Sequence, residues 1–176
     1  MVQFTRSFCS LCLIAVSFAA PTKRTVAQVE ADITDISNQA TTLDNDIKGF
    51  PASGIFGALA MENAVGSLET ALNKGTSDVQ ATGLINEADA TTMLNAVKAI
   101  EPTIIDGLEQ LTAKESDIFR DPPKEVVLSD LKNLQTATDA FAGALIAAAP
   151  ADLTAQATSI QSAIDAAFAT AIAAYS

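Results

Sequence analysis

The stretch that decides the fold is Met93–Leu111, MLNAVKAIEPTIIDGLEQL. Its large apolar residues lie 4, 3, 4, 4 and 3 positions apart, at Met93, Val97, Ile100, Ile104, Leu108 and Leu111. Residues three and four apart share one side of an α-helix, so this spacing predicts a helix with one apolar face. The pattern keeps its register across Pro102, a residue that removes a backbone hydrogen bond and bends a helix. We therefore predict a single helix that is kinked at Pro102.

The same spacing predicts four further amphipathic helices on either side of this one. They cover residues 25–48, 53–75, 124–149 and 150–176, and the helix with Pro102 extends from residue 86 to about residue 120. Ser53 and Asn86 are predicted N-caps, and residues 76–85 fit either a helix or a linker. No segment alternates as a strand does. The sequence predicts an all-α fold, an antiparallel bundle of about five amphipathic helices in which acidic residues such as Asp32 and Asp44 lie on the outer faces.

The first 24 residues are expected to be removed from the mature protein. A short basic start with Arg6 precedes an apolar run, FCSLCLIAVSF (Phe8–Phe18), that is too short to span a bilayer. Small residues favour cleavage after Ala19, and the dibasic pair Lys23-Arg24 favours a second cut. We predict a signal peptide at 1–19, a short propeptide at 20–24 and a single domain at 25–176, which makes the protein secreted and extracellular.

The charge of the expected mature chain excludes two classes of partner. Residues 25–176 hold 7 Lys and Arg against 21 Asp and Glu, a net charge of −14. Nucleic acids and anionic lipid head groups both require a cationic face, which this chain does not offer. Cys9 and Cys12 are lost with the signal peptide, so the domain depends on core burial without a disulfide. No transmembrane segment is predicted in the mature chain.

The residue types also argue against catalysis. The expected mature chain has neither His nor Cys, which removes the usual general base, the thiolate nucleophile and the imidazole metal ligands. Paired carboxylates can cleave glycosides, but acids on outward helix faces are normally only solvated. We therefore predict a protein that is not an enzyme and that needs neither a metal nor a cofactor.

Three segments carry a resemblance to a known family. They are VKAIEPTIIDGLEQLTAKES (Val97–Ser116), LSDLKNLQTATDAF (Leu128–Phe141) and APADLTAQATSIQSAIDAAFATAIAAYS (Ala149–Ser176). Together they resemble the fungal hydrophobic surface-binding protein A family, which is related to antigenic cell-wall galactomannoproteins. The resemblance implies a secreted helical bundle that adsorbs to hydrophobic surfaces, holds a fatty acid between its helices, or does both. It also implies recruitment of secreted esterases such as cutinases.

The alternative function is a structural or antigenic cell-wall mannoprotein without a small-molecule ligand. An apolar cavity between the helices would favour lipid binding, whereas a solid core would favour the structural role. Alanine makes up 17 of the residues from 137 to 176, and the sequence leaves open whether such a core is tight or hollow. The candidate lipid- or surface-contacting residues are the large ones on the apolar helix faces. They are Phe56, Leu59, Met93, Phe119, Phe141 and Phe168, and each can instead be an ordinary core residue.

Overall fold

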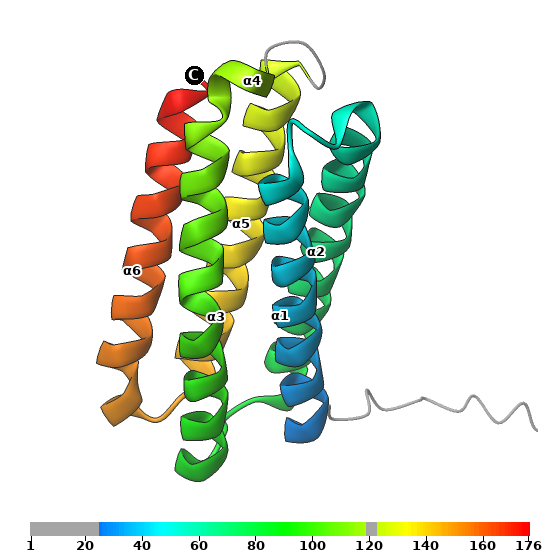
Figure 1. Cartoon of the computed structure of the whole chain (residues 1–176). Helices are drawn as coiled ribbons and strands as arrows, with labels where there is room; N and C mark the ends of the chain where they lie inside the picture. Colours follow the sequence, from blue (N-terminus) through cyan, green and yellow to red (C-terminus); the bar gives the residue numbers. More distant parts are fainter. Residues whose placement is uncertain (1–24, 119–122) are drawn as a thin grey trace, which may run out of the picture.

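The computed structural model describes residues 25–118 and 123–176, and all regular secondary structure in these ranges is helical (Figure 1). The elements are α1 (Val26–Gly49), α2 (Gly54–Thr82), α3 (Glu87–Ala113), the single turn α4 (Glu115–Ile118), α5 (Lys124–Ala148) and α6 (Ala151–Ala174). Successive long helices run in opposite directions along the bundle (Figure 1). The predicted all-α bundle is therefore confirmed. Residues 1–24, which hold the predicted signal peptide and propeptide, lie outside the described residues.

The five long helices form a closed ring. Each packs chiefly on two neighbours, in the order α1, α2, α5, α6, α3 and back to α1 (Figure 1). With neighbouring axes about 10 Å apart, the centre of such a ring lies about 8.5 Å from every axis, compared with about 7 Å in a ring of four. Side chains must reach further to fill this centre. A five-helix ring built from small residues is therefore prone to a hollow axis.

The helix ends follow local capping chemistry, and the structure decides between the alternatives that the sequence leaves open. Thr25 caps α1 in a capping box with Gln28, and the Asn86 side chain accepts a hydrogen bond from the Asp89 amide at 3.1 Å. Ser53 occupies the N-cap position of α2, as predicted, but its side chain makes no capping hydrogen bond. The second helix also continues to Thr82 and ends at Gly83, whose φ of 78° suits glycine.

The helix that contains Pro102 is continuous, as predicted, although it is shorter than expected. Pro102 lies inside α3, which ends at Ala113 rather than near residue 120, and α4 follows as a separate turn. The apolar residues on both sides of Pro102 remain buried, including Met93, Ile100 and Leu108. Packing along this face therefore maintains the helix across a residue that by itself disfavours it.

Specific contacts close the ring at its upper end in Figure 1. The Tyr175 hydroxyl, in a side chain that is only 2% exposed, donates a hydrogen bond of 2.9 Å to the Leu111 carbonyl and ties the end of α6 to α3. Lys114 donates to the Lys48 and Phe50 carbonyls and so joins the end of α3 to the end of α1. Within the described residues, no helix is both long and apolar enough to cross a membrane.

Candidate functional site

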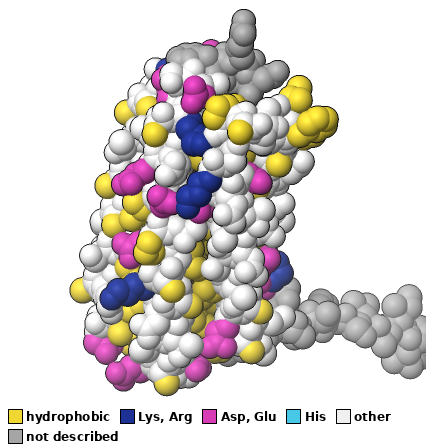
Figure 2. All heavy atoms as spheres, in the orientation of Figure 1, with side chains coloured by type: hydrophobic (Ala, Val, Ile, Leu, Met, Phe, Trp, Pro, Cys, Tyr) yellow, Lys and Arg dark blue, Asp and Glu magenta, His cyan; other side chains and the backbone are white. Residues whose placement is uncertain are grey.

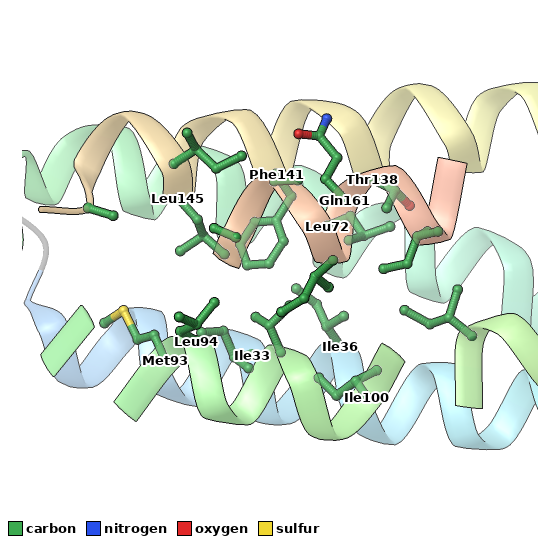
Figure 3. A pocket seen from close by; sticks show the side chains of 18 of the residues that line it. Ile33, Ile36, Leu72, Met93, Leu94, Ile100, Thr138, Phe141, Leu145 and Gln161 are labelled. Carbon is green, nitrogen blue, oxygen red and sulfur yellow. The ribbon is translucent and has the colours of Figure 1, made fainter. Parts of the chain in front are cut away.

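An apolar cavity lies along the axis of the ring, surrounded by all five long helices (Figure 3). We call it the lower cavity, and its volume is about 110 Å³. Ile33, Leu72 and Leu145 are typical of its walls, and only Thr138 and Gln161 among its described lining residues are polar. The predicted candidates Met93, Phe141 and Phe168 all line it and are at most 6% exposed.

A second cavity, the upper cavity, follows on the same axis toward the end where α2 begins. Its volume is about 100 Å³, and residues of α1, α2, α3, α5 and α6 line it. The two cavities share four lining residues, Leu68, Ile104, Leu134 and Phe168. These four side chains form a partition between the cavities. Two of the residues that line the upper cavity, Glu62 of α2 and Val126 of α5, are exposed to solvent.

The lower cavity matches a single hydrocarbon chain in length. Along α6 its lining extends from Leu153 to Phe168, which at 1.5 Å per residue is about 22 Å. Two lipid chains end to end form a bilayer core of about 30 Å, so that one chain needs about 15 Å. The lining is also chemically suited to such a chain, because it offers almost only aliphatic and aromatic surface.

The predicted contact residues Phe56 and Leu59 occupy a different place. With Ile55 they form what we call the apolar tip, at the start of α2. Ile55 is 65% exposed, Phe56 is 82% exposed and Leu59 is 55% exposed. Figure 2 shows apolar side chains gathered at this end of the molecule. Phe119 lies outside the described residues. The candidates thus divide between a buried cavity and an exposed tip, and their part in ligand contact stays a prediction.

The structure corrects the expectation that the acids of the first helix lie on outer faces. Asp32 and Asp44 are each 6% exposed, and Asp78 of α2 is 3% exposed. Lys74 pairs with Asp32 across the α1–α2 interface and with Asp78 at 3.1 Å. Burial raises the pKa of Asp32, an effect that the hydrogen bond from Lys74 only partly opposes. In the sequence, the spacing of four residues between Lys74 and Asp78 indicates that these two side chains can pair on one helix face.

Lys48 organises a second group of charges between α1 and α3. Its ammonium lies 2.8 Å from Asp44 Oδ2 and 2.7 Å from Asp106 Oδ2. The hydrogen bond from Lys48 lowers the pKa of Asp106. The other oxygen of Asp44, Oδ1, is buried, makes no hydrogen bond and belongs to a side chain that lines the upper cavity.

Two carboxyl groups, one from α5 and one from α6, meet without a cation between them. Asp139 of α5 and Asp165 of α6 each bury an Oδ1 atom that has no hydrogen-bond partner among the described residues. Burial, and then the hydrogen bond and charge of Asp139, raise the pKa of Asp165 to about 6. A single proton shared by the two groups would satisfy both oxygens. Sequence reasoning missed this pair because its members are 26 residues apart on different helices.

The Asp139–Asp165 pair predicts a pH-dependent stability. The raised pKa of Asp165 gives a stabilising contribution that is fully present below its ordinary pKa of 3.8 and is lost as the pH rises through about 6. Asp165→Asn should therefore raise the melting temperature at pH 7.5 by a few degrees and leave it nearly unchanged at pH 4.5. Thermal unfolding followed by circular dichroism measures this. The exposed control Asp35→Asn makes the same charge change, and an equal gain in that variant would exclude the pair as the cause.

No group of three or more His, Cys, Asp or Glu side chains among residues 25–118 and 123–176 is arranged to hold a metal ion. The arrangement that these residues do provide is an apolar interior with a few polar groups at its wall. Such a site can bind and orient a ligand, mainly through apolar contact.

Comparisons with known proteins agree with this geometry. The model of the family described as hydrophobic surface binding protein A matches residues 26–147. The crystal structure of Afmp4p in complex with palmitic acid is 33% identical, with a TM-score of 0.82, and the match covers 86% of this chain and 100% of that one. Ligand binding domain 1 of the Penicillium marneffei MP1 protein, complexed with arachidonic acids, has the same fold at 16% identity, with a TM-score of 0.79 over 86% of this chain and 99% of that one.

Ligand binding domain 2 of the same Penicillium marneffei protein, complexed with multiple arachidonic acids, is also similar in fold. Its TM-score is 0.77 at 18% identity, over 88% of this chain and 98% of that one. A comparison with curated protein sequences gives no match. On the evidence of the family model and of the relative with 33% identity, the chain belongs to the hydrophobic surface binding protein A family.

Proposed function

We propose that this protein is a binding protein without catalytic activity that holds the hydrocarbon chain of a lipid inside its helix ring. The observation that carries the proposal is the lower cavity, which is apolar, elongated and lined by residues of all five long helices. The relative crystallised with palmitic acid supports it, because the match covers that whole chain. The cavity also favours this function over a purely structural wall protein, which has no need of a hollow core.

Binding must enlarge the cavity. At about 110 Å³ it is smaller than an engineered protein cavity of about 150 Å³ that accommodates benzene. Each buried CH₂ group contributes about 0.8 kcal/mol, so a long chain can offset the cost of moving helices apart. The alanine-rich helices α5 and α6 present small side chains at this wall, among them Ala142 and Ala157.

A substitution that fills the lower cavity tests the proposal. Ala157→Phe places a ring in the cavity, whereas Ala155→Phe places the same ring on the exposed side of α6. We expect native mass spectrometry to show one sixteen-carbon lipid per wild-type chain, a loss of at least tenfold in affinity for Ala157→Phe, and no loss for Ala155→Phe. Equal binding by the two variants would place the lipid elsewhere.

The apolar tip supports a second function, adsorption to hydrophobic surfaces. Phe56 is 82% exposed and adjoins the exposed Ile55 and Leu59, so these side chains can reach a solid surface without unfolding of the helix ring. Large exposed apolar groups that lie together usually mark an interaction site. The net charge of −14 for residues 25–176 makes electrostatic capture by an anionic surface unfavourable.

We expect Phe56→Ser to lower adsorption to polyester or alkyl-coated beads several-fold without changing the melting temperature. Leu84→Ser is the matched control, because Leu84 is 86% exposed but lies in the α2–α3 connection at the opposite end of the bundle (Figure 1). Wild-type adsorption should persist as sodium sulfate is raised, since excluded salts favour apolar contact. Release by salt alone would indicate an electrostatic mechanism instead.

We also propose that residues 1–19 are a signal peptide, that residues 20–24 are removed at Lys23-Arg24, and that the secreted domain begins at Thr25. The capping box at Thr25 supports this boundary, because the first helix begins directly after it. N-terminal sequencing of the secreted protein tests the boundary. Wall association and recruitment of esterases such as cutinases belong to the same proposal, and co-sedimentation of a cutinase with protein-coated beads tests the recruitment.

A further inference from the structure

The hydroxyl groups of two threonines are left without partners at the cavity walls. Thirteen helical threonines between Thr34 and Thr170 donate to the carbonyl oxygen four residues earlier. Thr138 and Thr103 are the exceptions within the described helices, and Thr138 lines the lower cavity whereas Thr103 lines the upper one. Because a helical threonine can satisfy its hydroxyl locally, these two are free to bond a ligand.

Thr138 and Gln161 are the two polar residues in the described lining of the lower cavity, and we call this pair the polar spot. Figure 3 shows both on the side of the cavity formed by α5 and α6, opposite Ile33, Leu94 and Ile100. The Gln161 amide makes no hydrogen bond to another described residue, and it offers both donor and acceptor atoms. A lipid head group with its own donor and acceptor, such as a hydroxyl, can bond to either side chain.

The charges around both cavities are unsuited to an anionic head group. No Lys or Arg is among the described residues that line either cavity. The charged residues that line the upper cavity are Asp44, Glu62 and Asp130, and burial together with Glu62 and Glu69 raises the pKa of Asp130. Asp165 lies four residues after Gln161 on α6, so the two share one helix face, and Asp139 follows Thr138 on α5. A buried carboxylate without a cation is strongly disfavoured, and nearby carboxylates add repulsion.

We propose that the ring selects single-chain lipids whose head group is uncharged and bears a hydroxyl, in preference to the anion of a fatty acid of equal length. The proposal rests on the lipid-binding function proposed above and specifies the chemical class of its ligand. Long-chain alcohols belong to this class, as does a fatty acid in its protonated form. The Thr138–Gln161 polar spot binds the head group, and the apolar walls bind the chain.

A competition between two lipids of the same length tests the selectivity. The protein is incubated at pH 8 with equimolar hexadecan-1-ol and palmitate, and the bound lipid is extracted and quantified by mass spectrometry. We expect at least tenfold more of the alcohol. Equal or greater retention of palmitate would overturn the selectivity while upholding lipid binding, whereas retention of neither lipid would overturn the proposed function as well.

Two isosteric variants test which side chains produce the selectivity. The Thr138 hydroxyl has no partner among the described residues, so Thr138→Val removes only a hydrogen bond to the ligand. We expect it to lower the affinity for hexadecan-1-ol about fivefold, which corresponds to one hydrogen bond. Thr136→Val, on the exposed side of α5, should leave the affinity unchanged. Asp165→Asn should raise the share of bound palmitate at least threefold, and Asp35→Asn should not. Unchanged binding in both Thr138→Val and Asp165→Asn would exclude the polar spot as the head-group site.

Discussion

Replacement of Phe168 by Ala is expected to lower the free energy of unfolding by about 3–5 kcal/mol, the usual cost of deleting a buried phenylalanine. Phe168 is 3% exposed and belongs to the partition that separates the two cavities. Its removal both forfeits apolar burial and adds empty volume next to both cavities. Urea denaturation followed by circular dichroism measures the change, with an unaltered m-value as evidence that two-state unfolding is retained.

Phe56→Ala is the matched control for this experiment, since it deletes the same ring from a side chain that is 82% exposed. We expect a change within about 0.5 kcal/mol for Phe56→Ala, as is usual for exposed positions. A saturating lipid should restore part of the stability lost in Phe168→Ala, because a ligand that fills the enlarged cavity binds only the folded state. Equal losses in the two variants would contradict the division into a buried cavity and an exposed tip.

The sequence predicts the apolar face of α2, but it does not predict which residues of that face are buried in the ring and which are exposed at the apolar tip. Phe56 and Leu59 continue the same apolar helix face as Leu68 and Leu72, and the spacing of these residues predicts the face correctly. Leu68 and Leu72 are buried, whereas Phe56 and Leu59 are exposed. An amphipathic pattern identifies the side of a helix that is apolar, but whether another helix covers each turn of that side depends on the tertiary arrangement.

The hollow axis has a similar explanation. The sequence predicts about five helices, which the structure confirms, and its C-terminal end is rich in alanine. The order of the helices around the ring is set by contacts between segments distant in sequence, such as α2 with α5 and α3 with α6. Only this order determines that Met93, Phe141 and Phe168 face one common space. The sequence likewise does not show that the Thr138 hydroxyl lacks the intrahelical hydrogen bond that most other helical threonines make.

The buried acids illustrate the same limit for charged residues. Asp32 lies beside Ile33 in sequence and was assigned to the outer face of the first helix, yet α2 covers it and Lys74 reaches it from 42 positions away. A carboxylate is rarely buried unless it is paired, so sequence reasoning favours exposure. The pairing partner that reverses this expectation is supplied by the fold.

Lys74→Met is accordingly expected to destabilise the protein by about 2–3 kcal/mol. Loss of one partner from a buried pair costs about 3–5 kcal/mol, and the smaller value applies here because the Lys74 side chain is 58% exposed and water screens its charge. The variant keeps the aliphatic stem but leaves Asp32 and Asp78 side by side without the ammonium that bridges them. Lys132→Met is the control, since Lys132 is exposed on α5 and forms no ion pair with a described residue.

Adding Asp32→Asn to Lys74→Met should recover about half of the loss, because it removes the buried charge of Asp32 that Lys74 balances and replaces it with a neutral group of the same size. Urea denaturation at pH 7 of the two single variants, the double variant and the Lys132→Met control measures all four changes. At pH 4 the loss in Lys74→Met should shrink, since burial raises the pKa of Asp32 and protonation then removes the charge that Lys74 balances. A loss in Lys74→Met no larger than that in Lys132→Met would show that solvent, rather than Lys74, stabilises the carboxylates at the α1–α2 interface.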